Sequence, residues 1–403
     1  MELQQMVLED LKVCASYSKC WRARERAQDD VFGTEEESYE RLAEYLHALK
    51  LANPGTVTDI KTEVDDGGRE RFLYMFLSFG ASIKGFRYLR RVLVVDGTHL
   101  TGKYKGVLLT ASGQDANFQV FPLAFSVVDS ENDEAWTWFF EKLERIIADS
   151  NTLTIISDRN QSIYKAKRSV FPLAKHAACI VHLARNVNAK FQNKGLAKMV
   201  SNAGYAYTIG SFRTQYNQIR EKNLECAKYL DKIGTAHWSR VYFQGERYNL
   251  MTSNIAESLN RALWKGRGSP IVELLKFIRA MLTRWFSARR TKAGKHRVGM
   301  LNGKHNVLLD HKRCTCKQYD KDKIPCGHAM FAANTHGIPL DTLVGDFYKT
   351  SAWKASYEGV INPEGQLNCN GVQGAKGPGT TGLAVPILYK WDVVLMAIVS
   401  SWV

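Results

Sequence analysis

The sequence predicts an α/β fold in which a mixed five-stranded sheet is flanked by helices. Two observations carry this prediction. Short apolar runs, each the length of one strand, occur between residues 91 and 187, and amphipathic segments separate them. Their order is strand, strand, strand, helix, strand, helix, strand, which is typical of a mixed sheet covered by helices. A chain of 403 residues can also hold two or three domains and at least one large core.

The N-terminal region, residues 1–70, is predicted to be mainly helical. Its clearest helix is EEESYERLAEYLHALKL, residues 35–51. Residues 51–70 are polar and contain Gly and Asp, so we expect a loop or a hairpin at the edge of a sheet.

The predicted sheet begins with RVLVVDGTHL (91–100), an apolar run that leads into an acidic residue. The segment GVLLTASGQDANFQVFPLAFSVVD (106–129) predicts two more strands joined by a polar turn. The segment DEAWTWFFEKLERII (133–147) predicts an amphipathic helix. Its apolar face consists of Trp136, Phe139, Phe140, Leu143, Ile146 and Ile147.

Strands and helices then alternate. LTIISD (153–158) predicts a buried strand that ends in an acid, QSIYKAKRSVF (161–171) a short helix, and HAACIVHLARNV (176–187) a strand that leads into a helix. Residues 186–250 are basic and mostly helical in pattern. We therefore predict one domain over residues 71–265 with a helical insertion at about 186–250.

A basic amphipathic helix and linker are predicted over residues 266–300. The apolar face of this helix consists of Ile271, Leu274, Leu275, Ile278, Met281, Leu282 and Trp285. Its last turn is rich in Arg, which suits a helix C-terminus and could also face phosphates. The candidate phosphate-binding residues are Arg284, Arg289, Arg290, Lys292, Lys295 and Arg297. The segment after Pro363 is Gly-rich and polar, and we expect residues 341–403 to be a largely disordered tail.

The net charge of +15 favours a polyanionic partner, most simply nucleic acid, although many basic proteins bind none. The first residues lack the apolar core of a secretory signal, and the apolar run at the C-terminus is too short to span a bilayer. Five of the eight cysteines are scattered singly, which suits a reducing compartment. We expect a soluble intracellular protein without a membrane partner.

Two acidic residues stand at the ends of predicted strands, Asp96 after VLVV and Asp158 after LTII. If the strands are parallel neighbours, both carboxylates emerge at the same edge and cannot both ionise cheaply without a cation. Two Mg²⁺ or Mn²⁺ ions would relieve this repulsion and can serve phosphoryl transfer. The alternative is that acids at strand ends are ordinary loop residues.

A cysteine cluster lies at Cys314, Cys316, Cys326 and His328, with the spacing C-x-C-x9-C-x-H. Three thiolates and one imidazole are the right number and kind of ligands for one structural Zn²⁺ in tetrahedral geometry. The ligands form two close pairs, which suits a small hairpin that leads into a helix. Unrelated free cysteines are the alternative.

The motifs VVDGTHLTGKYKGVLLTASGQDANFQVFPLAFSVVD, ISDRNQSIYKA and HAACIVHLARNV, within about residues 75–190, resemble the catalytic domain of Mutator-like element (MULE) transposases. The resemblance implies an RNase H-like fold and DDE transposase chemistry, with Asp96 as the first acid and Asp158 as the second. It also implies a third acid further along, for which Glu257 in NIAE is the best candidate.

Two parts of the implied site have competing explanations. Asn254 and Glu257 also fit a capping box, in which Glu257 would bond back to the helix start. Cys179 and His182 resemble the C-x-x-H motif of the family, but two ligands do not complete a zinc site. A buried Cys and a packed His that support the edge of the site are the alternative.

The cysteine cluster, including its IPCGHA segment, resembles a SWIM zinc finger, which we place at residues 301–340. The resemblances together imply a nuclear protein that cleaves and transfers DNA strands, with element terminal repeats and target DNA as partners and a homo-oligomer in the synaptic complex. A short segment before the finger and the absence of a recognisable N-terminal DNA-binding finger favour another expectation. This is a domesticated or decayed transposase that regulates transcription by binding DNA without catalysis. A nuclease acting on RNA is a third.

Overall fold

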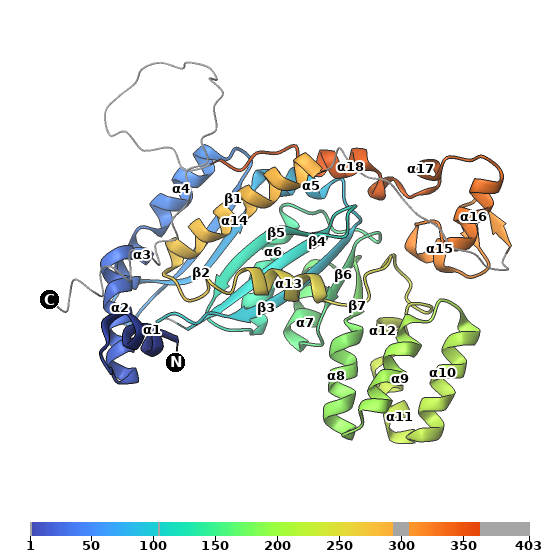
Figure 1. Ribbon diagram of the computed structural model, residues 1–403, viewed down its shortest axis with the longest axis horizontal. Helices are drawn as coiled ribbons and strands as arrows, with labels where there is room; N and C mark the ends of the chain where they lie inside the picture. Colours follow the sequence, from blue (N-terminus) through green and yellow to red (C-terminus); the bar gives the residue numbers. More distant parts are fainter. Residues whose placement is uncertain (1, 104, 293–305, 363–403) are drawn as a thin grey trace, which may run out of the picture.

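The computed structural model describes residues 2–103, 105–292 and 306–362. Its centre is a seven-stranded sheet in the order β1-β2-β5-β4-β3-β6-β7 (Figure 1). The strands are β1 Val57–Val64, β2 Glu70–Ser78, β3 Val92–His99, β4 Val107–Gln114, β5 Val120–Val128, β6 Thr154–Ser157 and β7 Lys175–Ala178. β3, β6 and β7 run parallel to one another, and the other neighbours are antiparallel. The predicted α/β class and mixed sheet are confirmed.

The sheet has two strands more than the five predicted. β1 and β2 form a hairpin, and β2 continues the sheet because it pairs with β5. Residues 51–70, which include β1, were predicted as a loop or edge hairpin. Residues 75–77 of β2 are fully buried and pair with β5. The hairpin therefore belongs to the sheet, which the local sequence pattern does not reveal.

The helices around the sheet have these bounds: α1 Glu2–Leu11, α2 Tyr17–Phe32, α3 Glu35–Glu40, α4 Leu42–Ala52, α5 Gly80–Phe86, α6 Asp133–Glu144, α7 Gln161–Val170, α13 Asn254–Ala262 and α14 Ile271–Lys292. The helix predicted over residues 35–51 is divided into α3 and α4 at Arg41. The apolar faces predicted for α6 and α14 pack into the main core. The predicted amphipathic helix is thus present as α14, and the linker expected to follow it, up to residue 300, falls outside the described residues.

The helical insertion consists of α8 Ile180–Phe191, α9 Lys194–Tyr205, α10 Ile209–Lys222, α11 Leu224–Ile233 and α12 Thr235–Trp238. These helices surround a hydrophobic core of their own, centred on Leu183, Phe212 and Trp238. The insertion projects from the β7 edge of the sheet (Figure 1). Residues 239–253 lead the chain back to the sheet, where α13 begins.

The C-terminal elements are β8 Val307–Leu308, β9 Arg313–Cys314, α15 Gln318–Asp322, α16 Gly327–Thr335, α17 Leu340–Leu343, the 3₁₀ helix η1 Asp346–Tyr348 and α18 Thr350–Ser356. The prediction of a disordered tail from residue 341 is wrong for residues 341–362. Trp353, Tyr357 and Ile361 are buried in the main core. The Gly-rich stretch that suggested disorder begins only after Pro363, outside the described residues.

Within the described residues, no helix is both long and apolar enough to cross a membrane.

Candidate active site and zinc centre

Asp96 and Asp158 lie at the same edge of the sheet. In the parallel pairing of β3 with β6, Val94 is the partner of Ile156. Asp96 lies two residues further along β3, and Asp158 directly follows the last residue of β6, so both stand at the carboxyl end of this parallel pair. Val94 and Ile156 pack against the start of α13, and the Asp96 side chain projects on the same face as Val94, towards this helix.

α13 brings Glu257 and Asn260 to that face. The Nδ2 of Asn260 donates a hydrogen bond to Oδ2 of Asp96 at 2.9 Å. Glu257 lies in the first turn of α13, and its Oε1 is 3.1 Å from Arg185 Nη1 and 3.6 Å from His182 Nε2. The N-cap of α13 is Ser253, and no side chain caps this end of the helix. The capping-box alternative is therefore wrong.

Burial and neighbouring carboxylates raise the pKa of two acids in this region, Asp96 and Glu131. Burial, followed by the negative charge of Asp158, raises the pKa of Asp96 to about 7, and Glu131 and Glu257 add to this effect while His182 opposes it. Burial and Asp158 also raise the pKa of Glu131. A cation placed among these carboxylates would favour their ionised forms.

The donor set fits Mg²⁺ or Mn²⁺ in kind, since these ions prefer carboxylate oxygens. The acids are not a compact cluster. In the described part of the chain, the one group of three or more Cys, His, Asp or Glu side chains whose ligand atoms all lie within 4.8 Å of one another is the cysteine cluster. Mg²⁺ commonly binds through one or two carboxylates and keeps several waters, so looser spacing suits it.

Cys179 and His182 hold the start of α13. Cys179 is fully buried, and its Sγ accepts a hydrogen bond from the Ser253 N–H at 3.2 Å. His182 Nδ1 lies 3.2 Å from the Ser253 hydroxyl. Burial acts to raise the pKa of Cys179, but hydrogen bonds from His182 and Ser253 outweigh it and lower the value to about 7. These contacts agree with a supporting role at the edge of the site.

Sequence reasoning did not identify Glu131 and Asn160. Nδ2 of Asn160 donates to Glu131 Oε2 at 3.0 Å, and the Asn160 N–H donates to Asp158 Oδ1, also at 3.0 Å. Glu131 lies against Gly97, where an added Cβ would be 2.3 Å from its Oε1. The glycine after Asp96 was the signal in the sequence, since a residue with a side chain would collide with Glu131.

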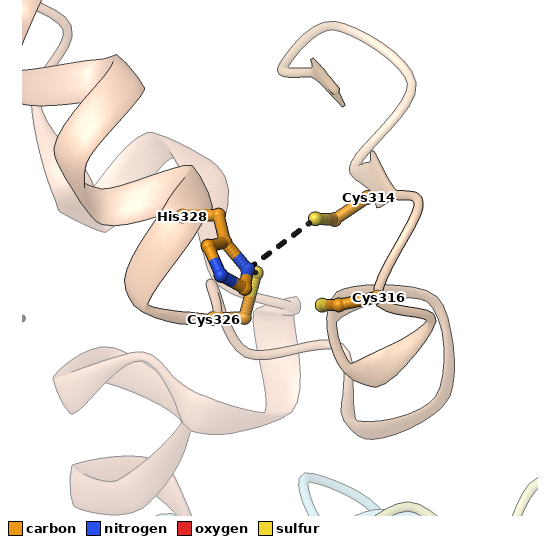
Figure 2. Close-up of side chains that lie close together, drawn as sticks. All are labelled: Cys314, Cys316, Cys326 and His328. Atoms are coloured by element: carbon orange, nitrogen blue, oxygen red, sulfur yellow. Dashed lines mark hydrogen bonds between the residues drawn. The ribbon is translucent and has the colours of Figure 1, made fainter. Parts of the chain in front are cut away.

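The predicted zinc ligands do converge. Figure 2 shows Cys314, Cys316, Cys326 and His328 facing one another around a common centre. Cys314 Sγ and Cys326 Sγ each lie 3.7 Å from His328 Nδ1. Ligands at ordinary Zn–S and Zn–N distances on a tetrahedron are separated by roughly 3.6–3.8 Å. The four residues therefore fit one Zn²⁺ ion.

Short elements carry these ligands. Cys314 ends β9, Cys316 follows it, and Cys326 is the N-cap of α16, whose first turn holds His328. Burial, together with the neighbouring thiols, raises the pKa of Cys314 to about 12. A thiolate at this position therefore requires a cation, which a bound Zn²⁺ would supply.

The predicted phosphate-binding residues on α14 are largely committed to the fold. Arg289 donates to the Val120 carbonyl and, at 3.0 Å, to the Tyr357 hydroxyl. Arg290 donates to the carbonyls of Tyr357 at 2.8 Å and Gly359 at 2.7 Å. The remaining candidates differ in position: Arg284 is exposed, whereas the Lys292 side chain, Lys295 and Arg297 lie outside the described residues.

Comparisons with known proteins match two segments of the chain to known families. Residues 92–186 match the MULE transposase domain, and residues 297–337 match the SWIM zinc finger. The chain is 27% identical over 155 residues to the transposase for insertion sequence element IS905 of Lactococcus lactis, a match that covers 38% of this chain and 36% of that protein. It is 23% identical over 146 residues to protein FAR1-RELATED SEQUENCE 6 of Arabidopsis thaliana, covering 36% of this chain and 20% of that protein.

The chain thus spans about a third or less of the length of these two curated relatives. The matched MULE segment contains Asp96, Asp158, Cys179 and His182, and the SWIM segment contains all four predicted zinc ligands. Glu257 lies between the two segments. Both resemblances are confirmed: the chain carries a MULE transposase domain followed by a SWIM zinc finger.

Proposed function

We propose that this protein is a DDE-type transposase that cleaves and transfers DNA strands with two divalent metal ions. The observation that carries the proposal is the placement of Asp96, Asp158 and Glu257 at one edge of the sheet, where burial and then the charges of Asp158 and Glu257 raise the pKa of Asp96. The match to the MULE transposase domain supports it.

The residues have distinct parts in this proposal. Asp96, Asp158 and Glu257 would hold Mg²⁺ or Mn²⁺, which when bound supplies activation of a water or DNA 3′-hydroxyl and stabilisation of the leaving oxygen. Asn260 orients Asp96 through its 2.9 Å hydrogen bond. The Asn160 N–H orients Asp158. Cys179 and His182 fix the start of α13, which positions Glu257 relative to the two aspartates.

The other expected properties extend this proposal. The DNA would include the terminal repeats of an element and its target, brought together by a homo-oligomer in the nucleus. The Zn²⁺ at Cys314, Cys316, Cys326 and His328 would be structural, because all four tetrahedral positions are supplied by protein and none is open to a substrate.

One contact favours a second candidate function. The carboxylate of Glu257 is 3.1 Å from the Arg185 guanidinium, so Arg185 competes with a metal ion for the third acid. A protein in which this ion pair persists would bind DNA without cutting it. This second candidate is a domesticated or decayed transposase that regulates transcription.

Nicking of supercoiled plasmid DNA in Mn²⁺ tests the proposal. We expect the wild type to nick a plasmid that carries candidate terminal repeats, and Asp96→Asn to be at least 100-fold slower, on the order of a lost electrostatic group in an active site. Glu225→Gln is the matched control, because it removes a carboxylate from the exposed surface of α11. If wild type and Asp96→Asn bind the plasmid equally and neither nicks it, the second candidate replaces the first.

A further inference from the structure

A basic pocket lies between the β7 edge of the sheet and the helical insertion. Its volume is about 900 Å³, and its walls come from α7, β7, α8, α11 and α12. We use the name basic pocket because six cationic side chains line it and no Asp or Glu does. The six are Arg159, Lys167, Arg168, Lys175, Lys190 and Lys232.

The six cations of the basic pocket do not make close contacts with acidic side chains in the described part of the chain. No ion pair found among the described residues involves any of the six cations. Their hydrogen bonds go to neutral groups instead. Arg159 donates to the Tyr229 hydroxyl, and Lys167 donates to the Pro172 carbonyl at 3.3 Å.

The acid whose charge acts on Lys167, Asp149, already accepts two backbone hydrogen bonds. Asp149 accepts hydrogen bonds from the backbone N–H groups of Leu173 at 2.8 Å and Ala174 at 2.9 Å. Burial lowers the pKa of Lys167, Asp149 opposes this shift, and the charges of Lys175 and Arg168 add to it. The repulsion between these cations disfavours their charged forms, and a bound anion would relieve it. Since they form no salt bridge, an anion can bind without first breaking one.

Aromatic rings complete the lining of the basic pocket. The ring of Tyr229 lies 5.4 Å from the Arg159 guanidinium and 4.6 Å from Lys190 Nζ. The rings of Tyr164 and His176 are 4.1 Å apart. Burial lowers the pKa of His176 to about 3, so this side chain stays neutral. Cations interleaved with aromatic rings are typical of surfaces that bind nucleic-acid strands.

The basic pocket adjoins the candidate active site. Arg159 is the residue next to Asp158, and Asn160, which orients Asp158, is the N-cap of α7. A DNA strand whose phosphate lies at Asp158 therefore has this pocket beside it. Two of the arginines predicted for phosphate binding on α14 are held by protein carbonyls, so that helix offers less free positive charge than the sequence suggests.

We propose that the basic pocket binds the phosphodiester backbone of DNA that flanks the strand held at Asp96 and Asp158. The identity of the ligand as DNA rests on the proposed function. The site itself rests on six cations without acidic partners in one pocket beside Asp158. Contacts of this kind recognise phosphates and not bases, so binding should be independent of sequence.

Two charge-matched triple variants test the proposal. Arg168→Gln, Lys190→Gln and Lys232→Gln remove three exposed cations of the basic pocket. Lys198→Gln, Arg213→Gln and Lys222→Gln remove three exposed cations from α9 and α10 of the same insertion, outside the pocket. Each set lowers the net charge equally, and surface positions limit any effect on folding, which thermal unfolding of all three proteins checks.

The measurement is fluorescence anisotropy of a labelled 30-base-pair duplex of arbitrary sequence, without divalent cations, between about 50 and 200 mM salt. We expect the pocket variant to bind at least tenfold more weakly at the lower salt, with the slope of log K against log salt reduced by about 2–3. The control variant should keep the slope of the wild type. A second duplex of unrelated sequence should show the same losses.

An unchanged slope in the pocket variant, or an equal loss in the control variant, would overturn the proposal. Because the assay contains no divalent metal, its result does not depend on cleavage. A protein that binds DNA through the pocket but never nicks a plasmid would leave this proposal intact and remove the proposed catalytic function. If the wild type nicks DNA and the pocket variant binds DNA normally, only the pocket proposal is refuted.

Discussion

Several distant parts of the chain determine the position and the pKa of Asp96. Its position at the end of β3 comes from the strand itself. Its environment comes from Asp158, which directly follows β6, and from Asn260 on α13. Burial and the neighbouring carboxylates raise the pKa of Asp96 to about 7, far above its usual value of 3.8. The carboxyl group is therefore neutral in the metal-free protein at mildly acidic pH.

This shift predicts how metal-free stability depends on pH. Between about pH 4 and 7 the unfolded state releases the Asp96 proton while the folded state keeps it, so stability falls as pH rises through this window. Asp96→Asn removes this pH dependence. From pH 4 to pH 8, we expect the free energy of unfolding of the wild type to fall by about 2–4 kcal/mol relative to that of the variant.

Urea unfolding at several pH values, in buffer without added divalent cations or chelators, measures this difference. Adding Mn²⁺ at pH 8 should restore stability to the wild type and have little effect on Asp96→Asn, because the ion binds the folded site. Parallel pH curves for the two proteins would contradict the assigned environment of Asp96.

At the scale of elements, the zinc finger depends on ligands more than on its own core. β8 and β9 have 2 residues each, α15 has 5 and α16 has 9. The hydrophobic cluster of the finger is small, and two of its six buried members are predicted zinc ligands: Cys314, Tyr319, Cys326, Ala329, Ala333 and Leu343. Elements this short do not fold by themselves, so a Zn²⁺ ion bound by the four ligands would supply part of their folding free energy.

Loss of one ligand should therefore unfold the finger locally. We expect Cys326→Ser to lower the zinc content from one ion per chain to none, because a Ser hydroxyl does not replace a thiolate. Backbone amides between residues 313 and 338 should then exchange rapidly, while those of β3 and β4 stay protected. Cys14→Ser, at an exposed cysteine, is the control and should keep the metal. Zinc in the variant equal to that in the wild type would exclude this ligand set.

At the scale of the whole molecule, Arg90 joins three parts of the chain. Its side chain is 1% exposed, and it donates to Gln114 Oε1 at 2.7 Å, to Asn249 Oδ1 at 2.5 Å and to the Tyr348 hydroxyl at 3.0 Å. These partners belong to β4, to the segment that returns from the insertion, and to η1 after the zinc finger. The Arg90 guanidinium also lies 4.6 Å from the centre of the Tyr348 ring.

Replacing this arginine should weaken all three connections. We expect Arg90→Met to lower the free energy of unfolding by on the order of 3 kcal/mol, since several buried hydrogen bonds to a charged group are lost together. Arg90→Lys should recover only part of this loss, because an ammonium cannot reach partners in three directions as the planar guanidinium does. Arg87→Met, at an exposed position three residues away, is the control. A change below about 0.5 kcal/mol in Arg90→Met would show that Arg90 does not join these parts.

Features that depend on residues close together in the chain could be predicted from the amino-acid sequence. Apolar runs and helical periodicity indicated β3–β7, α6 and α14, because a buried strand or helix face requires apolar residues at regular, short spacings. The shared position of Asp96 and Asp158 could be predicted because the ends of parallel strands lie at one edge of a sheet. The convergence of the four predicted zinc ligands could be predicted because they lie within fifteen residues, Cys314 to His328.

Features that depend on contacts between distant segments were settled by the folded chain. The capping box that Asn254 and Glu257 fit in the sequence is excluded only by the structure, in which Ser253 is the N-cap of α13 and the Glu257 carboxylate lies beside Arg185 and His182. The two-strand extension of the sheet depends on the pairing of β2 with β5, and the basic pocket on the packing of the insertion against β7. Arg289 resembled a phosphate ligand because a sequence shows a charge but not its hydrogen-bond partners, which here come from β5 and Tyr357.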